Sequence, residues 1–292
     1  MKILLTGGNG QLGTDLRRAL GFAELVTTTR NGEDADAALD VADVDAVAKF
    51  IRAFRPDVVV NAAAYTAVDR AESEVDAALA ANARGPGAMA RACAATGAML
   101  VHYSTDYVFD GASAQPYRED DPTSPLGVYG LSKLEGEQAI RASGARHLIL
   151  RTAWVYAMHG HNFLRTMLRL GAEREELRVV ADQTGCPTPA WLIAGITARL
   201  LSQADAVPEG TRHLVASGTT TWHGFADAIF EEALHHGLID RRPRVVPIAT
   251  ADYPTPARRP AYSVLSTDAL QTDLGEALPH WRDALAVTFV GG

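Results

Sequence analysis

The chain has 292 residues, and its 47% apolar and 21% charged residues are the usual composition of a soluble globular protein with one large domain or a domain and a smaller lobe. Its formal net charge of −8 is spread without long runs of one sign, which argues against a nucleic-acid-binding surface. No apolar run approaches the roughly 20 residues of a membrane span and the strand pattern starts at once, so we expect a cytoplasmic protein with neither signal peptide nor membrane contact.

The first predicted strand, residues 2–6, runs into a glycine-rich loop and then into a helical pattern. Gly7, Gly10 and Gly13 give the spacing GxxGxxG between strand and helix. Such glycines allow a tight turn and a close approach of the backbone to a pyrophosphate, with N–H groups directed at the anion. A lone pattern of this kind often marks only a turn, but its place between strand and helix predicts a dinucleotide-binding loop.

The second predicted strand ends in Thr-Thr-Arg at 28–30, where an acidic residue usually holds the ribose of NAD. A hydroxyl and a guanidinium suit a 2′-phosphate, which favours NADPH over NADH. The alternative interpretation is that Arg30 is a surface residue. Asp40 and Val41 precede a predicted helix over 44–54 and are placed to contact the adenine.

The third predicted strand, residues 57–60, is apolar throughout and typical of a buried parallel strand. It runs into Asn-Ala-Ala-Ala-Tyr-Thr-Ala-Val-Asp at 61–69. Small residues at the carboxyl end of a strand let a ligand lie close to the backbone, although alanines also pack helices on sheets. Asn82, in the helical region that follows, is either a buried link or polar surface.

The fourth predicted strand, residues 99–103, leads to Thr105, and a helix starts near Tyr129 after two prolines. Tyr129 and Lys133 stand four apart, so both side chains lie on one helical face. A phenol has an ordinary pKa of about 10, and a neighbouring ammonium helps it release its proton. This pair suits protonation of a carbonyl oxygen as a hydride arrives, with the Thr105 hydroxyl on the same oxygen. Alone, such a pair is often a half-buried aromatic beside a solvated charge.

Three further features have either two possible interpretations or a structural one. Trp154 follows the fifth predicted strand, residues 147–152, and either walls a substrate pocket or plugs the core. Arg258 and Arg259 stand between prolines near the C-terminus, where they form either a diphosphate clamp or part of a solvated loop. His102 lies inside a strand and is interpreted as a packed residue rather than a base.

The order of elements predicts an α/β fold, a Rossmann-type doubly wound parallel sheet with a smaller C-terminal substrate-binding lobe. The NAD(P)-binding domain is expected over residues 1–155, with later elements from about 177–235 returning to it. Residues 213–215 are strand-like and lie within that later stretch. Residues 156–292 are expected to form mainly the lobe. Ligands should lie at the carboxyl ends of the strands, between the two parts.

Several stretches resemble known families. Ser-Thr-Asp-Tyr-Val-Phe-Asp-Gly at 104–111 and Tyr-Gly-Leu-Ser-Lys at 129–133 resemble the extended short-chain dehydrogenase/reductase superfamily. Blocks across most of the chain look like the dTDP-4-dehydrorhamnose reductase family, at 61–69, 151–156, 215–222 and 254–260. This resemblance implies NAD(P)H-dependent reduction of the C4 keto group of dTDP-4-dehydro-β-L-rhamnose to dTDP-L-rhamnose, the last step of that nucleotide-sugar pathway.

The resemblance also implies roles for individual residues. Tyr129 would protonate the C4 oxygen, Thr105 would share that contact, and Lys133 would hold the nicotinamide ribose and lower the pKa of the phenol. With the reasoning above, the expected cofactor-binding residues are Gly7, Gly10, Gln11, Leu12, Gly13, Arg30, Asp40, Val41, Ala63, Ala64, Tyr65, Tyr129 and Lys133. The expected substrate-binding residues are Thr66, Val68, Thr105, Asp106, Tyr129, Trp154, Arg258 and Arg259.

Some members of this family dimerise through magnesium held by carboxylates. Asp15 could fill the first such position, but Trp191 and the tail at 287–290 offer no acid. We therefore assign no metal ligands, expect magnesium only as a partner of the diphosphate, and expect a monomer or a homodimer. Cys93 and Cys186 lack metal-ligand spacing and are interpreted as thiols in a reducing compartment.

Two alternatives belong to different classes. The first is an epimerase or dehydratase of the same superfamily; the carboxylate of Asp106 is followed by Tyr107 rather than a glutamate, which argues against dehydration. The second is a non-catalytic protein similar to the regulatory subunit of methionine adenosyltransferase. Intact Thr105, Tyr129 and Lys133 argue against that second alternative, because a binding protein does not need them.

Overall fold

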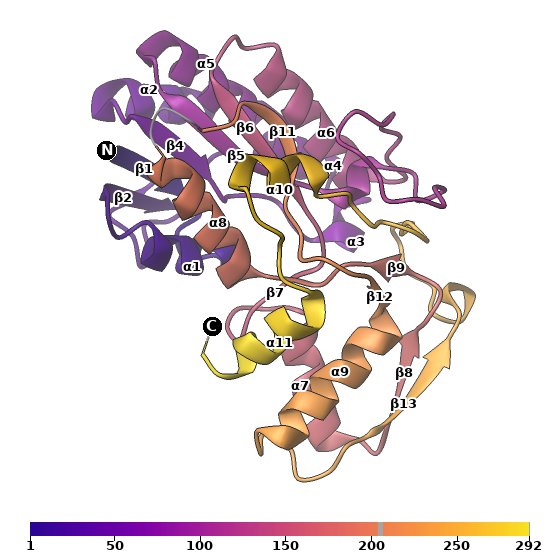
Figure 1. Cartoon of the computed structure of the whole chain (residues 1–292). Helices are drawn as coiled ribbons and strands as arrows, with labels where there is room; N and C mark the ends of the chain where they lie inside the picture. The colour runs from indigo at the N-terminus through magenta and orange to yellow at the C-terminus, as the bar shows by residue number, and fades with distance from the viewer. Residues whose placement is uncertain (204–206, 292) are drawn as a thin grey trace.

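The structure is a computed structural model that describes residues 1–203 and 207–291. The strands of its main sheet are β1 Lys2–Thr6, β2 Glu24–Thr29, β3 Ala37–Ala38, β4 Val58–Asn61, β5 Met99–Thr105, β6 His147–Thr152 and β11 Gly210–His213. They are parallel and follow the order β11-β6-β5-β4-β1-β2-β3 (Figure 1). The chain progresses in one direction from β1 to β3 and in the other from β4 to β11, so the predicted Rossmann-type doubly wound sheet is confirmed.

Helices cover both faces of this sheet. One face carries α1 Gln11–Ala19 and α8 Ala190–Ser202, and the other carries α2 Val44–Phe54, α5 Gly85–Thr96 and α6 Val128–Arg141 (Figure 1). Short helical segments link them: α3 Val68–Ala71, α4 Val75–Leu79, the π-helical turn η1 Ala80–Arg84 and the 3₁₀ turn η2 Asp106–Val108.

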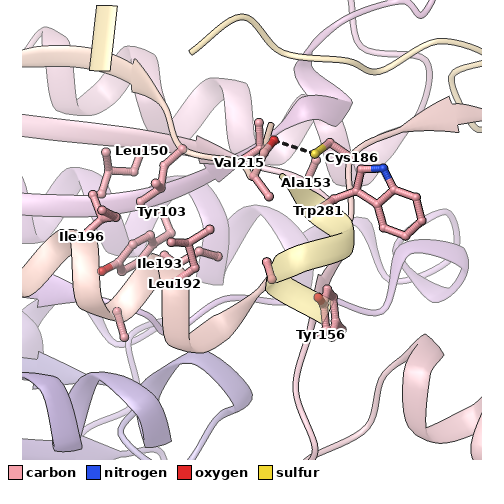
Figure 2. Packing of buried hydrophobic residues seen from close by; sticks show 14 of the residues in the cluster. Tyr103, Leu150, Ala153, Tyr156, Cys186, Leu192, Ile193, Ile196, Val215 and Trp281 are labelled. Atoms are coloured by element: carbon pink, nitrogen blue, oxygen red, sulfur yellow. Dashed lines mark hydrogen bonds between the residues drawn. The ribbon is translucent and has the colours of Figure 1, made fainter. Parts of the chain in front are cut away.

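The two faces have separate hydrophobic cores because side chains alternate along each strand. Ile3 and Leu5 of β1 join the core beneath α1 and α8, whereas Leu4 joins the core beneath α2 and α5. Figure 2 shows part of the first core, where Ile193 and Ile196 of α8 approach Tyr103 and Leu150 of the sheet. Both cores are fully buried, and they fix the carboxyl ends of the strands that carry the polar residues.

A smaller lobe is built around a second parallel pair of strands, β8 Glu176–Val180 and β13 Arg244–Ile248. Helices α7 Phe163–Glu173 and α9 Trp222–His235 pack together beside this pair (Figure 1). The remaining elements are β7 Val155–Tyr156, β9 Thr184–Gly185, β10 Thr188–Pro189, β12 Thr220–Thr221, η3 Thr250–Asp252, α10 Asp268–Leu274 and α11 Trp281–Phe289.

The second half of the chain divides its elements between the sheet and the lobe. Helix α8 packs on α1, β11 pairs with β6, and α10 lies against β11, so these three belong with the main sheet. Strand β8 and helix α9 also fall within residues 177–235 but lie in the lobe. The expected strand over 213–215 ends at His213, because pairing with β6 holds residues 210–213. The domain boundaries themselves stay a prediction.

A buried ion pair fastens α6 to the sheet. Arg151 of β6 donates to both carboxylate oxygens of Glu137 of α6, over 2.9 and 2.8 Å. The same guanidinium donates to the backbone carbonyl of Glu119, 3.2 Å away, and lies 5.1 Å over the ring of Phe109. Glu137 is 0% exposed, and the hydrogen bonds and charge of Arg151 outweigh burial and lower the pKa of the carboxyl. This pair sets the position of the helix that carries Tyr129 and Lys133.

Candidate active site

The glycine loop is built for a close backbone approach. Gly7 has a φ of +74°, and the N–H groups of Gly7 and Gly8 donate to the carbonyl of Thr28, over 2.8 and 3.1 Å. A Cβ on Gly13 would lie 2.0 Å from the carbonyl oxygen of Gly7. Gly10 precedes α1 and brings no side-chain hydrogen bond to its first turn. The loop and the uncapped helix start therefore fit the pyrophosphate of a dinucleotide.

Replacing Gly13 with alanine is expected to weaken NADPH binding by about tenfold or more, or ~1.4 kcal/mol and upward, because the methyl group would open the loop. The dissociation constant, measured by titration of NADPH fluorescence, checks this. Gly195→Ala is the matched control: a Cβ at Gly195 of α8 meets no atom within 4 Å, so binding should stay unchanged. Equal affinity of Gly13→Ala and wild type would contradict the placement of the pyrophosphate.

Arg30 and Asp40 meet beside the glycine loop at the carboxyl end of β2. Arg30 Nε lies 2.9 Å from Asp40 Oδ2, and the Arg30 side chain is 84% exposed. Thr28 and Thr29 are buried, and the Thr29 hydroxyl donates to the carbonyl of Glu33. Of the Thr-Thr-Arg run, only the guanidinium is therefore presented to a ligand at this edge.

Asn82 is a buried link rather than polar surface. Its amide accepts from the N–H of Tyr65 over 2.8 Å and donates to the carbonyl of Tyr65 over 2.9 Å. It also donates to the hydroxyl of Ser132 on α6. A Cβ on Gly7 would lie 2.7 Å from the backbone nitrogen of Ala63, so Ala63 borders the glycine loop. The structure thus brings two predicted cofactor-binding stretches together.

Thr105 and Tyr129 come together where β5 meets the start of α6. Thr105 ends β5, and its hydroxyl donates to Asp106 Oδ1 over 3.0 Å and accepts from the N–H of Tyr107. The ring of Tyr129 packs edge-on against Tyr107, with 5.5 Å between ring centroids. This approach depends on Gly130, where a Cβ would lie 2.2 Å from the carbonyl oxygen of Tyr107.

The phenol of Tyr129 holds its proton firmly. Desolvation raises its pKa to about 12, a hydrogen-bonding contact with Thr105 lowers it, and the charge of Asp106 adds to the rise. At neutral pH the group is therefore a proton donor, as a general acid must be. Burial also raises the pKa of Asp106 to about 6, so this carboxyl titrates just below neutral pH.

Lys133 is 2% exposed and points to the sheet rather than to the phenol. Its ammonium donates to the carbonyl of Tyr103 over 2.5 Å and lies 3.3 Å from Nε2 of His102. Burial lowers the pKa of Lys133 to about 8, against the charge of Glu137. The expected lowering of the pKa of Tyr129 by Lys133 is absent from this arrangement, because the backbone carbonyl holds the ammonium.

Trp154 stands at the junction of the main sheet and the lobe. Its φ is +48°, and its ring stacks on Trp222 of α9 with centroids 3.6 Å apart and planes 6° apart. A Cβ on Gly185 would lie 2.5 Å from Trp154 Cε2, so the indole is held on both sides. Beside the stack, Trp222 and Gln183 line a cavity of about 700 Å³.

Arg259 lines the same cavity and is tied to the main domain. Its guanidinium donates to both oxygens of Asp69 on α3, over 3.0 and 2.9 Å, and also bonds the carbonyl of Ala257. Arg258 is exposed, as is Thr66, whereas Val68 is half-buried at the start of α3. Of the two arginines between prolines, Arg259 therefore forms an ordered contact with α3, whereas Arg258 is solvated.

Several residues of this region escaped the sequence prediction. Asp69 pairs with an arginine 190 positions away, and Trp222 stacks on a residue of another element. Asp69 is the last residue of the block at 61–69, and Trp222 is the last residue of the block at 215–222. The resemblance of these two blocks to the family was the sequence signal that could have identified both residues. His102 is packed, as expected, but it also contacts Lys133 and Asn61.

Comparisons with known proteins identify the family of this chain. The family model described as the RmlD substrate binding domain matches residues 1–290. The dTDP-4-dehydrorhamnose reductase of Burkholderia thailandensis is 48% identical over 297 residues, covering 98% of this chain and 97% of that protein. The chain belongs to the dTDP-4-dehydrorhamnose reductase family.

Solved structures of this family have the same fold over the full length. The enzyme of Clostridium acetobutylicum, described as a dTDP-4-dehydrorhamnose reductase, gives a TM-score of 0.91 at 38% identity over 99% of both chains. The enzyme of Bacillus anthracis, solved in complex with NADP, also gives 0.91, at 34% identity over 100% of both chains. The chain has a site suited to a nicotinamide dinucleotide, the class of cofactor present in the Bacillus anthracis complex.

Proposed function

We propose that this chain reduces the C4 keto group of dTDP-4-dehydro-β-L-rhamnose to give dTDP-L-rhamnose, with hydride from NADPH, as the last step of dTDP-rhamnose biosynthesis. Membership of the reductase family supports the reaction. The observation that carries it is the placement of a protonated phenol, Tyr129, beside Thr105 at the carboxyl end of β5.

Bound NADPH supplies the hydride for C4 of the sugar. Tyr129 gives its proton to the C4 oxygen, and the hydroxyl of Thr105 bonds the same oxygen and orients it. Lys133 holds the nicotinamide ribose from the same face of α6. Gly7, with the rest of the glycine loop at Gly10–Gly13, receives the pyrophosphate at the start of α1.

The choice of NADPH rests on the edge of the sheet beside β2. Arg30 presents an exposed guanidinium there, which suits a 2′-phosphate, and Asp40 and Val41 border the adenine. The NADP complex of the Bacillus anthracis relative supports the same choice. Ala63, Ala64 and Tyr65 then flank the cofactor opposite the glycine loop. NADH is the competing cofactor.

The sugar nucleotide would lie between the main sheet and the lobe. Asp106 and Trp154 would contact the sugar, with Thr66 and Val68 at its edge. Arg258 and Arg259 would meet the diphosphate, and Arg259 is already oriented by Asp69. The Rossmann domain would then cover residues 1–155 with α8, β11 and α10, and the lobe most of the remainder.

Assembly and location complete the proposal. We place the enzyme in the cytoplasm as a monomer or homodimer, with magnesium only as a partner of the substrate diphosphate. Within residues 1–203 and 207–291, none of the helices is both long and apolar enough to span a membrane.

The test is the oxidation of NADPH, followed by absorbance, with enzymatically made dTDP-4-dehydro-β-L-rhamnose and with NADH as second cofactor. We expect stoichiometric formation of dTDP-L-rhamnose and a higher kcat/KM with NADPH than with NADH. An epimerase would interconvert sugars without net NADPH consumption. A protein that binds NADPH but does not oxidise it with this substrate would contradict the proposal and favour the regulatory alternative.

A further inference from the structure

A chain of buried hydrogen bonds runs from β1 to the catalytic lysine. Thr6 Oγ1 lies 2.7 Å from Asn61 Oδ1, Asn61 Nδ2 lies 2.9 Å from His102 Nδ1, and His102 Nε2 lies 3.3 Å from Lys133 Nζ. Each of the four side chains is 2% exposed or less. The chain crosses three neighbouring strands and ends on α6.

The direction of these bonds follows from one backbone donor. The N–H of Ala63 donates to Asn61 Oδ1 over 3.2 Å, so this atom of the amide is the oxygen and its partner toward His102 is the NH₂ group. Because the NH₂ group donates, Nδ1 of His102 must be an acceptor without a proton. A neutral imidazole then carries its proton on Nε2.

This tautomer places a donor in front of Lys133. Burial, with the charge of Lys133, holds the pKa of His102 well below its ordinary value, so the ring is neutral at neutral pH. Its Nε2–H can bond the lone pair of a neutral lysine amine, whereas an ammonium would face it donor to donor. Glu137 is an ionised group close to Lys133. Its charge favours the ammonium, and its carboxylate is itself paired with Arg151 and Arg141.

We propose that His102 is a positioning residue for the reductase, whose Nε2–H, fixed by Asn61 and Ala63, favours the neutral amine of Lys133 and lets this lysine exchange its proton near the working pH. The inference rests on the role proposed above for Lys133. It assigns the buried polar cluster of Thr6, Asn61 and His102 a function in the reaction, beyond packing.

Asn61→Asp reverses the direction of the bonds and tests the inference. A carboxylate still accepts from Ala63, but it turns Nδ1 of His102 into a donor, so that Nε2 becomes an acceptor for the ammonium of Lys133. The chain has only three lysines, Lys2, Lys49 and Lys133, so [13Cε]lysine labelling gives three signals, and Lys133→Met assigns the third.

In the wild type we expect the Lys133 signal to titrate near pH 8 and 15N spectra of His102 to show the proton on Nε2. In Asn61→Asp the His102 proton should move to Nδ1, and the titration midpoint of Lys133 should rise. The limb of the pH profile of kcat/KM that reports the titration of Lys133 should shift to higher pH as well. Thr6→Val removes one bond to the amide oxygen without changing its direction, and should leave the midpoint unchanged.

A proton on Nδ1 of His102 in the wild type would overturn the inference. This measurement does not depend on the folding of any variant. The variant His102→Leu distinguishes an effect of the Nε2–H group on the pKa of Lys133 from an effect of burial. Loss of the Nε2–H should raise the titration midpoint of Lys133, whereas greater desolvation alone would lower this midpoint further. The titrations need no turnover, so they remain decisive even if the sugar nucleotide is not reduced. Failure of the proposed function would instead appear in the NADPH assay alone.

Discussion

Tyr129→Phe is expected to lower kcat/KM for reduction of the sugar nucleotide by about 10²–10⁴-fold, the usual contribution of a positioned general acid. The phenyl ring would keep its edge-on contact with Tyr107, so α6 and the cofactor site should be unchanged. Steady-state NADPH oxidation measures the loss, and fluorescence titration shows whether NADPH still binds. Loss of turnover with intact binding would identify the phenol as the proton donor.

Tyr117→Phe is the matched control. The Tyr117 hydroxyl donates to Asp110 over 2.7 Å, and its ring stacks on Phe109, so the variant also loses one phenolic hydroxyl. Its activity should stay within about threefold of wild type, a difference of ~0.7 kcal/mol. If Tyr129→Phe keeps a tenth or more of wild-type activity, another group protonates the C4 oxygen and the role of Tyr129 is wrong.

Arg151→Met is expected to lower the free energy of unfolding by about 3–5 kcal/mol, because it leaves the carboxylate of Glu137 buried without its main partner. Arg141 remains 3.1 Å from Glu137, which favours the lower part of this range. Urea unfolding followed by circular dichroism measures the change. The double variant Glu137→Met with Arg151→Met should recover much of the loss, since no unpaired charge remains.

Arg146→Met is the surface control for this prediction. Arg146 and Glu209 lie 2.8 Å apart, as close as the buried pair, but both side chains are more than half exposed. Its loss should cost about 0–1 kcal/mol. A similar cost for Arg151→Met and Arg146→Met would show that burial of the Glu137 pair contributes little to stability.

The same region gives the chain a defined sensitivity to acid. Arg151 lowers the pKa of Glu137 despite burial, so that contribution to stability is complete above the ordinary carboxyl pKa and is lost as pH falls through the lowered one. Burial lowers the pKa of His213 from 6.5 to about 3, so the folded state takes up its proton later than the unfolded state. Its contribution therefore declines as pH falls from about 6.5 toward 3.

The sequence was informative where a feature depends on neighbours along the chain. The apolar run before Thr105 and the spacing of Tyr129 and Lys133 placed the strand end and the helix start correctly. The glycine spacing at 7, 10 and 13 predicted a tight loop, and the short distances that a Cβ would meet there agree. These features are local, and elementary geometry decides them.

Features that depend on distant partners were beyond the sequence. The direction of the Lys133 ammonium depends on a carbonyl of β5, and Arg259 contacts Asp69, which lies 190 positions away along the chain. The strand over 210–213 was expected to start three residues later, because Leu214 and Val215 are apolar. These two side chains are buried in the core, but the strand pairing with β6 ends at His213. Pairing and tertiary contacts, not local pattern, decide such positions.

The stack of Trp154 on Trp222 gives the molecule an optical reporter of its own. Two indoles with centroids 3.6 Å apart and nearly parallel planes couple their excited states, and one follows β6 of the main sheet while the other begins α9. The near-ultraviolet circular dichroism of the chain should therefore carry an exciton couplet that Trp222→Phe removes. Binding of any molecule that separates the two rings should therefore change this circular dichroism band, so that binding can be followed without a label.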